Sequence, residues 1–214
     1  MIRPDRLMTA FVLTLAAASP ALAGPPLLCH PYDIGSARSL PWDGTTGWSQ
    51  ERTDYPIKQL ATDTEAILQP ATPVVVRMET LRRAAIYASQ DPAVASSLVD
   101  RLVAKARADA KTHDGLASLD AAYLIEAMHQ LTMLGQSAQF RDRIDGLNRV
   151  LNGRNAVPFL EQAVQARPDD PSVAFAAALI AVSTDKAAAT KYAARARAGA
   201  SQDALVAKNL SHLF

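Results

Sequence analysis

Apolar side chains recur at helical spacing from Pro56 to the end of the chain. Ile57, Leu60 and Leu68 begin one such stripe, and Val74 and Leu81 belong to the next. Because residues three, four and seven positions apart share one face of a helix, this pattern predicts amphipathic helices. With its breaks it predicts nine of them, at residues 56–69, 73–89, 92–109, 118–134, 138–152, 156–167, 171–183, 185–198 and 202–213.

Capping signals mark several of these breaks. Thr72-Pro73, Asp91-Pro92 and Asp170-Pro171 each place an N-cap residue before a proline in the first turn. Connections of a few residues force consecutive helices to lie antiparallel. The sequence therefore predicts an all-α domain of antiparallel helix pairs over residues 56–214.

Residues 24–55 have a different composition, rich in proline and glycine. Proline removes a main-chain donor and glycine costs a helix about 1 kcal/mol, so this segment is predicted to be an extended arm with a turn at Asp43-Gly44. Trp42 and Trp48 fall in it, and each can bury about 200 Å². We expect both rings to pack on the helical body. The alternative is a free arm whose tryptophans are reserved for a partner.

The last third of the chain resembles the tetratricopeptide repeat. Residues 137–170 align with one repeat of that family, and residues 171–204 continue its helix-pair rhythm. The matching residues are Phe140 in the aromatic place, Ala156, Ala163 and Ala178 in small-residue places, and Pro168 after the second helix. The resemblance implies a right-handed superhelix with no chemistry attached. A compact orthogonal helical bundle is the alternative.

Residues 1–23 are typical of a cleavable signal peptide. A basic start is followed by the apolar run Leu7 to Ala18 and by the small-x-small pattern of residues 21–23, which predicts cleavage after Ala23. A retained anchor needs about 20 apolar residues, and Pro20 interrupts a shorter run. A lipoprotein would use Cys29, but bulky Leu28 precedes it. We therefore expect a periplasmic or secreted protein.

Cleavage would leave 191 residues with 20 basic and 20 acidic side chains. A chain with no net positive charge is not expected to bind nucleic acid, because phosphate neutralisation needs a basic surface. No second apolar run approaches membrane-spanning length, so no membrane insertion is expected after cleavage.

Cys29-His30 is the one pair that suggests chemistry. A thiolate beside an imidazole could act as a nucleophile or as two ligands for a soft metal. Neighbouring residues of an extended segment, however, point to opposite faces. The plain interpretation is a cysteine tucked against the helices and a solvated or hydrogen-bonded histidine.

One predicted helix carries a polar face made of Tyr123, Glu126 and Gln130. Such a face is usually solvated, and a binding groove is the functional alternative. Glu126-x-x-His129 also has the spacing of di-iron carboxylate bundles, but those sites need the motif twice and no second copy is present.

Basic residues gather at two further places. Arg77, Arg82 and Arg83, with Arg101 on the next helix, could collect an anion, although charges beside an apolar stripe normally lie on the solvated side. The run 191–197 is basic in the last turns of its helix, where cations complement the helix dipole.

Several enzyme signatures are missing, including the Gly-x-Ser-x-Gly elbow, His-Glu-x-x-His, the phosphate loop and the dinucleotide fingerprint. We therefore expect an exported helical-repeat protein, more a binder of a protein or peptide than an enzyme, and without a cofactor. Its candidate binding residues are Trp42, Trp48, Tyr123, Glu126 and Gln130. The alternative is a small periplasmic redox, metal-binding or enzymatic protein that uses Cys29 and His30.

Overall fold

The computed structural model describes residues 24–44, 48–109, 114–135 and 141–214, and within these ranges it is helical with no strand. The prediction of an all-α chain is confirmed, and each expected helix has its counterpart in these ranges. The α-helices are α1 (Leu60–Ile67), α2 (Val74–Ala88), α3 (Pro92–Asp109), α4 (Leu116–Met133), α5 (Arg141–Leu151), α6 (Val157–Ala166), α7 (Pro171–Ala181), α8 (Lys186–Gly199) and α9 (Ala204–Asn209). The 3₁₀ turns are η1 (Ile57–Gln59), η2 (Ala200–Gln202) and η3 (Leu210–His212). The expected signal peptide and Phe140 lie outside the described residues.

Aspartate side chains begin the later helices as the sequence predicts. Asp170 accepts hydrogen bonds from two main-chain amides of the first turn of α7, and Asp91 accepts one from Ala93 in α3. The expected cap at Thr72 is wrong. Its hydroxyl donates to the Ile67 carbonyl, 2.5 Å away, and so closes the end of α1.

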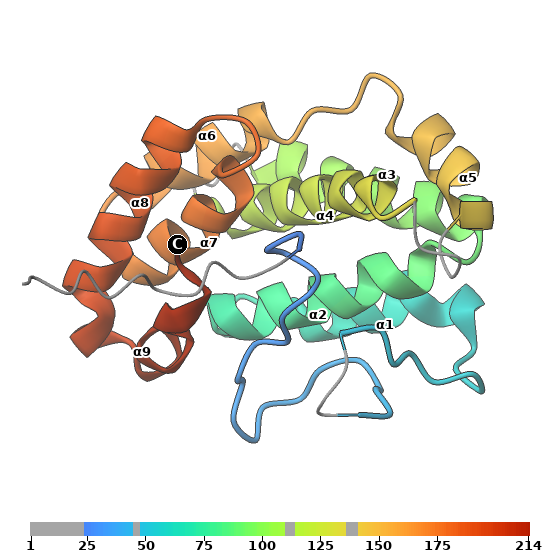
Figure 1. Ribbon diagram of the computed structural model, residues 1–214, viewed down its shortest axis with the longest axis horizontal. Coiled ribbons are helices and arrows are strands. Elements are labelled where there is room, and N and C mark those ends of the chain that lie inside the picture. The colour runs from blue at the N-terminus through green and yellow to red at the C-terminus, as the bar shows by residue number, and fades with distance from the viewer. Residues whose placement is uncertain (1–23, 45–47, 110–113, 136–140) are drawn as a thin grey trace, which may run out of the picture.

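Helix α4 lies at the centre of the body, where it contacts α2, α3, α5, α6 and α7 (Figure 1). Nearly every residue of α2, α4 and α7 is buried, whereas α8 packs mainly on α7 at one end of the molecule. The sequence of α7 is apolar on every side of the helix, and a helix of this kind is stable only where it is buried all round. None of the helices in the described ranges is both long and apolar enough to cross a membrane.

The described residues of the arm, 24–44 and 48–55, run over the helical body in Figure 1, and several of them belong to its core. Leu27, Leu28 and Leu40 are at most 1% exposed, while Trp42 and Trp48 are partly buried against the same core. The predicted packing of both rings is confirmed, but the leucines are the most deeply buried side chains of the arm. The turn expected at residues 43–44 coincides with a hydrogen bond from the Asp43 amide to the Gln50 carbonyl, 3.0 Å long.

Candidate functional site: the arm-binding face

We call the side chains of α2 and α4 that bind the arm the arm-binding face; they include Glu79, Arg82, Arg83, Tyr123 and Gln130. Glu79 lies in the middle of α2 and is completely buried. Its carboxylate accepts hydrogen bonds from Arg82 Nε and Nη2, at 2.7 and 2.8 Å, and from Arg83 Nε at 2.7 Å. The spacing of three and four residues places all three side chains on one helix face. Burial alone would raise the pKa of Glu79, but the two guanidinium groups outweigh it and hold that pKa below its usual value. The carboxylate is therefore charged and also accepts the main-chain amide of Tyr32 at 3.1 Å.

The two arginines bind main-chain carbonyls of the arm. Arg82 Nη1 donates to the carbonyl of Trp48 at 2.6 Å and to that of Leu28 at 3.3 Å, and Arg83 Nη1 donates to that of Leu40 at 2.5 Å. A buried guanidinium must satisfy its donors, and these carbonyls do so where water is excluded. The arm thus supplies hydrogen-bond acceptors for guanidinium nitrogens that do not bond to Glu79.

Trp42 lies against this network. The guanidinium carbons of Arg82 and Arg83 are 5.0 and 5.6 Å from the centroid of its ring, within the range of cation–π attraction. The ring of Tyr87 meets that of Trp42 edge-on at 5.7 Å, and its hydroxyl donates to the Pro41 carbonyl at 2.8 Å. Trp42 therefore serves to fix the arm on α2.

The polar face of α4 binds the start of the arm. Gln130 Oε1 accepts the Leu27 amide at 3.0 Å, and the Tyr123 hydroxyl donates to the Leu27 carbonyl at 2.9 Å. Glu126 accepts hydrogen bonds from Gln130 and from Ser183. Tyr123, Glu126 and Gln130 are at most 5% exposed, so the prediction of a solvated face is wrong. The structure brings these three residues together around the chain's own arm.

The end of the chain also binds the arm. The Asn209 side chain accepts from the Asp33 amide and donates to the Asp33 carbonyl, both at 2.9 Å, which is the pairing that a neighbouring strand would supply. The Tyr32 ring stacks on His212 with centroids 4.8 Å apart and meets Phe175 edge-on. Residues 176 positions apart in sequence are thereby held together.

The structure gives little support to a nucleophile or a metal site at Cys29 and His30. The amide of Cys29 donates to the Pro25 carbonyl, so the segment is a turn and not the expected extended strand. Cys29 is half-buried, and burial raises the pKa of its thiol despite the lowering effect of Arg82. His30 Nε2 and His212 Nδ1 are buried without a hydrogen-bond partner in the described part of the chain, and the two rings are 6.2 Å apart. Within the described residues no three His, Cys, Asp or Glu side chains are grouped to hold a metal.

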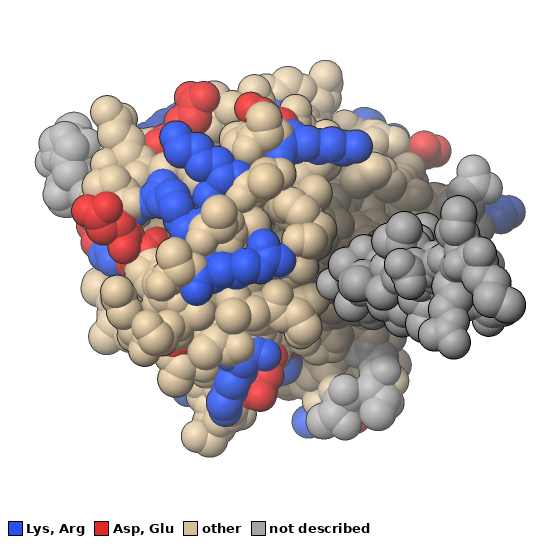
Figure 2. All heavy atoms as spheres, turned by 60° about the vertical axis from the view of Figure 1, so that its left-hand side comes forward, with Lys and Arg blue, Asp and Glu red and all other residues tan. Residues whose placement is uncertain are grey.

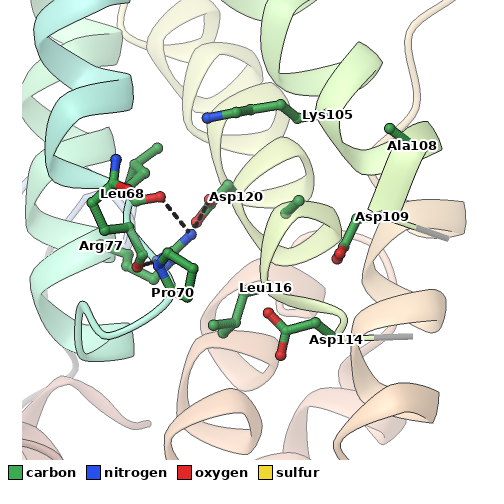
Figure 3. A pocket seen from close by; sticks show the side chains of 11 residues that line it. Leu68, Pro70, Arg77, Lys105, Ala108, Asp109, Asp114, Leu116 and Asp120 are labelled. Atoms are coloured by element: carbon green, nitrogen blue, oxygen red, sulfur yellow. Dashed lines mark hydrogen bonds and ion pairs between the residues drawn. The ribbon is translucent and has the colours of Figure 1, made fainter. Parts of the chain in front are cut away.

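A second ion pair borders an open cavity of about 410 Å³ between α3, α4 and the segment after α1 (Figure 3). Arg77 makes two hydrogen bonds to Asp120, at 2.9 and 2.6 Å, and donates to the carbonyls of Leu68 and Gln69. Lys105 extends over the cavity from α3 (Figure 3). Since every donor-bearing nitrogen of Arg77 is bonded within the protein, this arginine ties α2 to α4.

The buried arginines are what sequence reasoning missed. Arg77 and Arg82 are 4% and 0% exposed, so the prediction that they lie on the solvated side of their helix is wrong. The available signal was the run of apolar residues on every side of α2, which predicts burial all round. Arg101 behaves as predicted, since its side chain is 46% exposed and pairs with Glu65 at 2.9 Å. His129 and Glu126 have separate partners, the Arg154 carbonyl and Ser183.

The arm-binding face can recognise polypeptide main chain through side chains, since its carboxylate, guanidinium, phenol and amide groups contact amides and carbonyls of the arm. Comparison of the chain with family models, curated proteins and solved structures gave no match.

Proposed function

We propose that this chain is an exported, non-catalytic helical-repeat protein that binds a protein or peptide partner. Support for a tetratricopeptide-like arrangement comes from the contacts between alternate helices. Helix α1 contacts α3, which contacts α5, while α2 contacts α4, which contacts α6. Stacked helix pairs make contacts of this kind, although α5 and α6, which correspond to the segment that resembles one repeat, are not among the closely packed helix pairs. Helix α7 also contacts α2, so helices far apart in the array pack on each other, which they would not do in an open superhelix.

The observation that carries the proposal is how the helical body holds its arm. Gln130, Tyr123 and Asn209 bind main-chain amides and carbonyls of the arm, and in peptide recognition main-chain hydrogen bonds supply affinity. Here the bound segment belongs to the same chain and includes buried Leu27 and Leu28. The arm therefore occupies these groups itself, and we place the partner on surface that the arm leaves exposed.

Export rests on the pattern of residues 1–23, and the chain has a further feature that suits it. Its single cysteine is half-buried with a raised pKa, so little reactive thiolate is offered to an oxidising compartment. We expect the mature protein to begin at Gly24, which N-terminal sequencing of the exported protein tests directly. A start at another residue, or a lipid on Cys29, would contradict it.

The partner is sought with tagged residues 24–214 in an extract of exported proteins, by cross-linking and mass spectrometry. We expect the folded chain to capture one protein in an amount close to its own. The same chain should not capture that protein after heat unfolding. Iodide quenching of Trp42 and Trp48 should be unchanged in the complex, because the arm stays bound. A metal present at one equivalent, and lost in Cys29→Ser or His30→Gln, would refute the non-catalytic proposal and favour the redox or metal alternative.

A further inference from the structure

Helix α8 carries four cations and no acid. Lys186, Lys191, Arg195 and Arg197 lie within Lys186–Gly199, and the rest of that helix is mostly alanine. Figure 2 shows Lys and Arg side chains spread over this end of the molecule, with Asp and Glu mainly towards its edges. No ion pair is formed by Lys186, Lys191 or Arg195 within the part of the chain that the structure describes.

The cations border a smooth strip. Because an α-helix turns about 100° per residue, Ala187, Ala194 and Ala198 fall along the middle of the exposed side of α8. Lys186 and Arg197 lie on one flank of this strip, and Lys191 and Arg195 lie on the other. The opposite side of the helix, Ala189, Ala193 and Ala196, is buried. We call the strip and its two flanks the basic face.

The helix's own electrostatics do not account for these charges. Cations stabilise the last turn of a helix through its dipole, which explains Arg195 and Arg197. Lys186 occupies the first turn, where the same dipole is unfavourable to a cation, and Lys191 lies in the middle. The cations of the first two turns therefore have no explanation within α8.

Three acids close to α8 act as helix caps, and a fourth, Asp169, lines the same small cavity as Arg195. Asp185 caps α8, Asp203 caps α9 and Asp170 caps α7, each by accepting two main-chain amides. A capping carboxylate can also pair with a cation, as Asp170 does with Arg167 at 3.3 Å, but within the described residues no such pair reaches Lys186, Lys191 or Arg195. The basic face thus keeps its charge although the mature chain as a whole is balanced.

An exposed aromatic completes the edge of this surface. The Phe214 side chain is 53% exposed, and Arg197 Nη2 donates to the Phe214 main-chain oxygen at 2.8 Å. Aromatic and arginine side chains are enriched at the centres of protein interfaces. The edge beside Arg197 therefore offers an anchor of a kind that partner proteins use.

We propose that the basic face docks an acidic helix of a partner protein, one with a narrow row of small side chains flanked by Asp and Glu. Small residues let two helices approach to the shorter end of the usual 8–10 Å axial distance, and the flanking cations then meet the partner's carboxylates on both sides. A helix that binds a membrane surface instead presents large apolar side chains between its cations, and this face presents alanine. The inference rests on the proposed function and names the partner's chemistry.

The test uses residues 24–214 and a fluorescent helical peptide with an alanine row flanked by glutamates, measured by anisotropy. We expect saturable binding that weakens at least fivefold in the double variant Lys191→Glu/Arg195→Glu and weakens further as salt rises. The matched control is Arg107→Glu/Arg149→Glu, which reverses two exposed cations on α3 and α5 and should leave binding within twofold. Circular dichroism checks that each variant folds.

Three results would overturn the docking proposal. They are no saturable binding of the peptide, equal weakening in the control variant, or tighter binding to anionic phospholipid vesicles or duplex DNA than to the peptide. Capture from the extract separates this failure from that of the proposed function. A partner that both wild type and Lys191→Glu/Arg195→Glu retain equally would leave the protein a binder but place the contact elsewhere.

Discussion

Replacing Leu28 by alanine tests whether the arm is part of the folded core. Leu28 is completely buried, and its carbonyl accepts from Arg82. Substitutions of this kind in a close-packed core cost about 2–5 kcal/mol, since they lose apolar transfer and leave a cavity. For a domain of this size each kcal/mol lowers the melting temperature by about 2–4 °C, so we expect a fall of about 4–20 °C.

The assay has a built-in probe of the arm. Trp42 and Trp48 are the only tryptophans and both lie in the arm, so fluorescence follows the release of the arm while circular dichroism follows the helices. We expect the two urea transitions to coincide in the wild type and to move together in Leu28→Ala. The control Arg38→Ala, an exposed position in the same arm, should change stability by less than about 0.5 kcal/mol. An early fluorescence transition, with the helical transition unmoved by Leu28→Ala, would refute the reasoning.

The remaining predictions concern charge and the thiol. Arg82→Met should destabilise the fold by about 3 kcal/mol in urea unfolding, because it leaves Glu79 buried with one cation fewer, and Glu79→Leu/Arg82→Met should recover part of that loss. Burial, with the nearby His30, lowers the pKa of His212 from 6.5 to about 4, so the folded state resists protonation there. Stability should therefore fall as the pH drops from 6.5 to 4, and less in His212→Phe; equal slopes in the two melting series would contradict this. Cys29→Ser should shift the melting temperature by a few degrees at most and leave bound metal at zero by elemental analysis.

The helices could be predicted from sequence because their signals are local. Apolar spacing and the caps at Asp91 and Asp170 depend on residues within one or two turns, and the structure has helices where they predict them. The exception is instructive. Thr72 has the residue type of an N-cap but uses its hydroxyl to close the preceding helix.

The candidate site could not be predicted in the same way, because its partners are far apart in sequence. Gln130 is 103 residues from Leu27, and the residues next to either of them in the sequence do not indicate the contact. Arginine is a residue type that usually lies on the surface. Arg82 is part of the core only because Glu79 and carbonyl groups of the arm surround it. Position along a helix indicates which residues share a face, but it does not indicate what covers that face.

The clamp that Asn209 makes on Asp33 has a consequence for the order in which the molecule can be completed. A ribosome releases a chain from its beginning, so the arm is made first, and the amide that pairs with Asp33 is made 176 residues later. Through synthesis, Asp33 and Tyr32 remain without their contacts to Asn209 and His212. Only when α9 and η3 have been made can these two contacts form, so the attachment of this part of the arm to the end of the chain is a late step of folding.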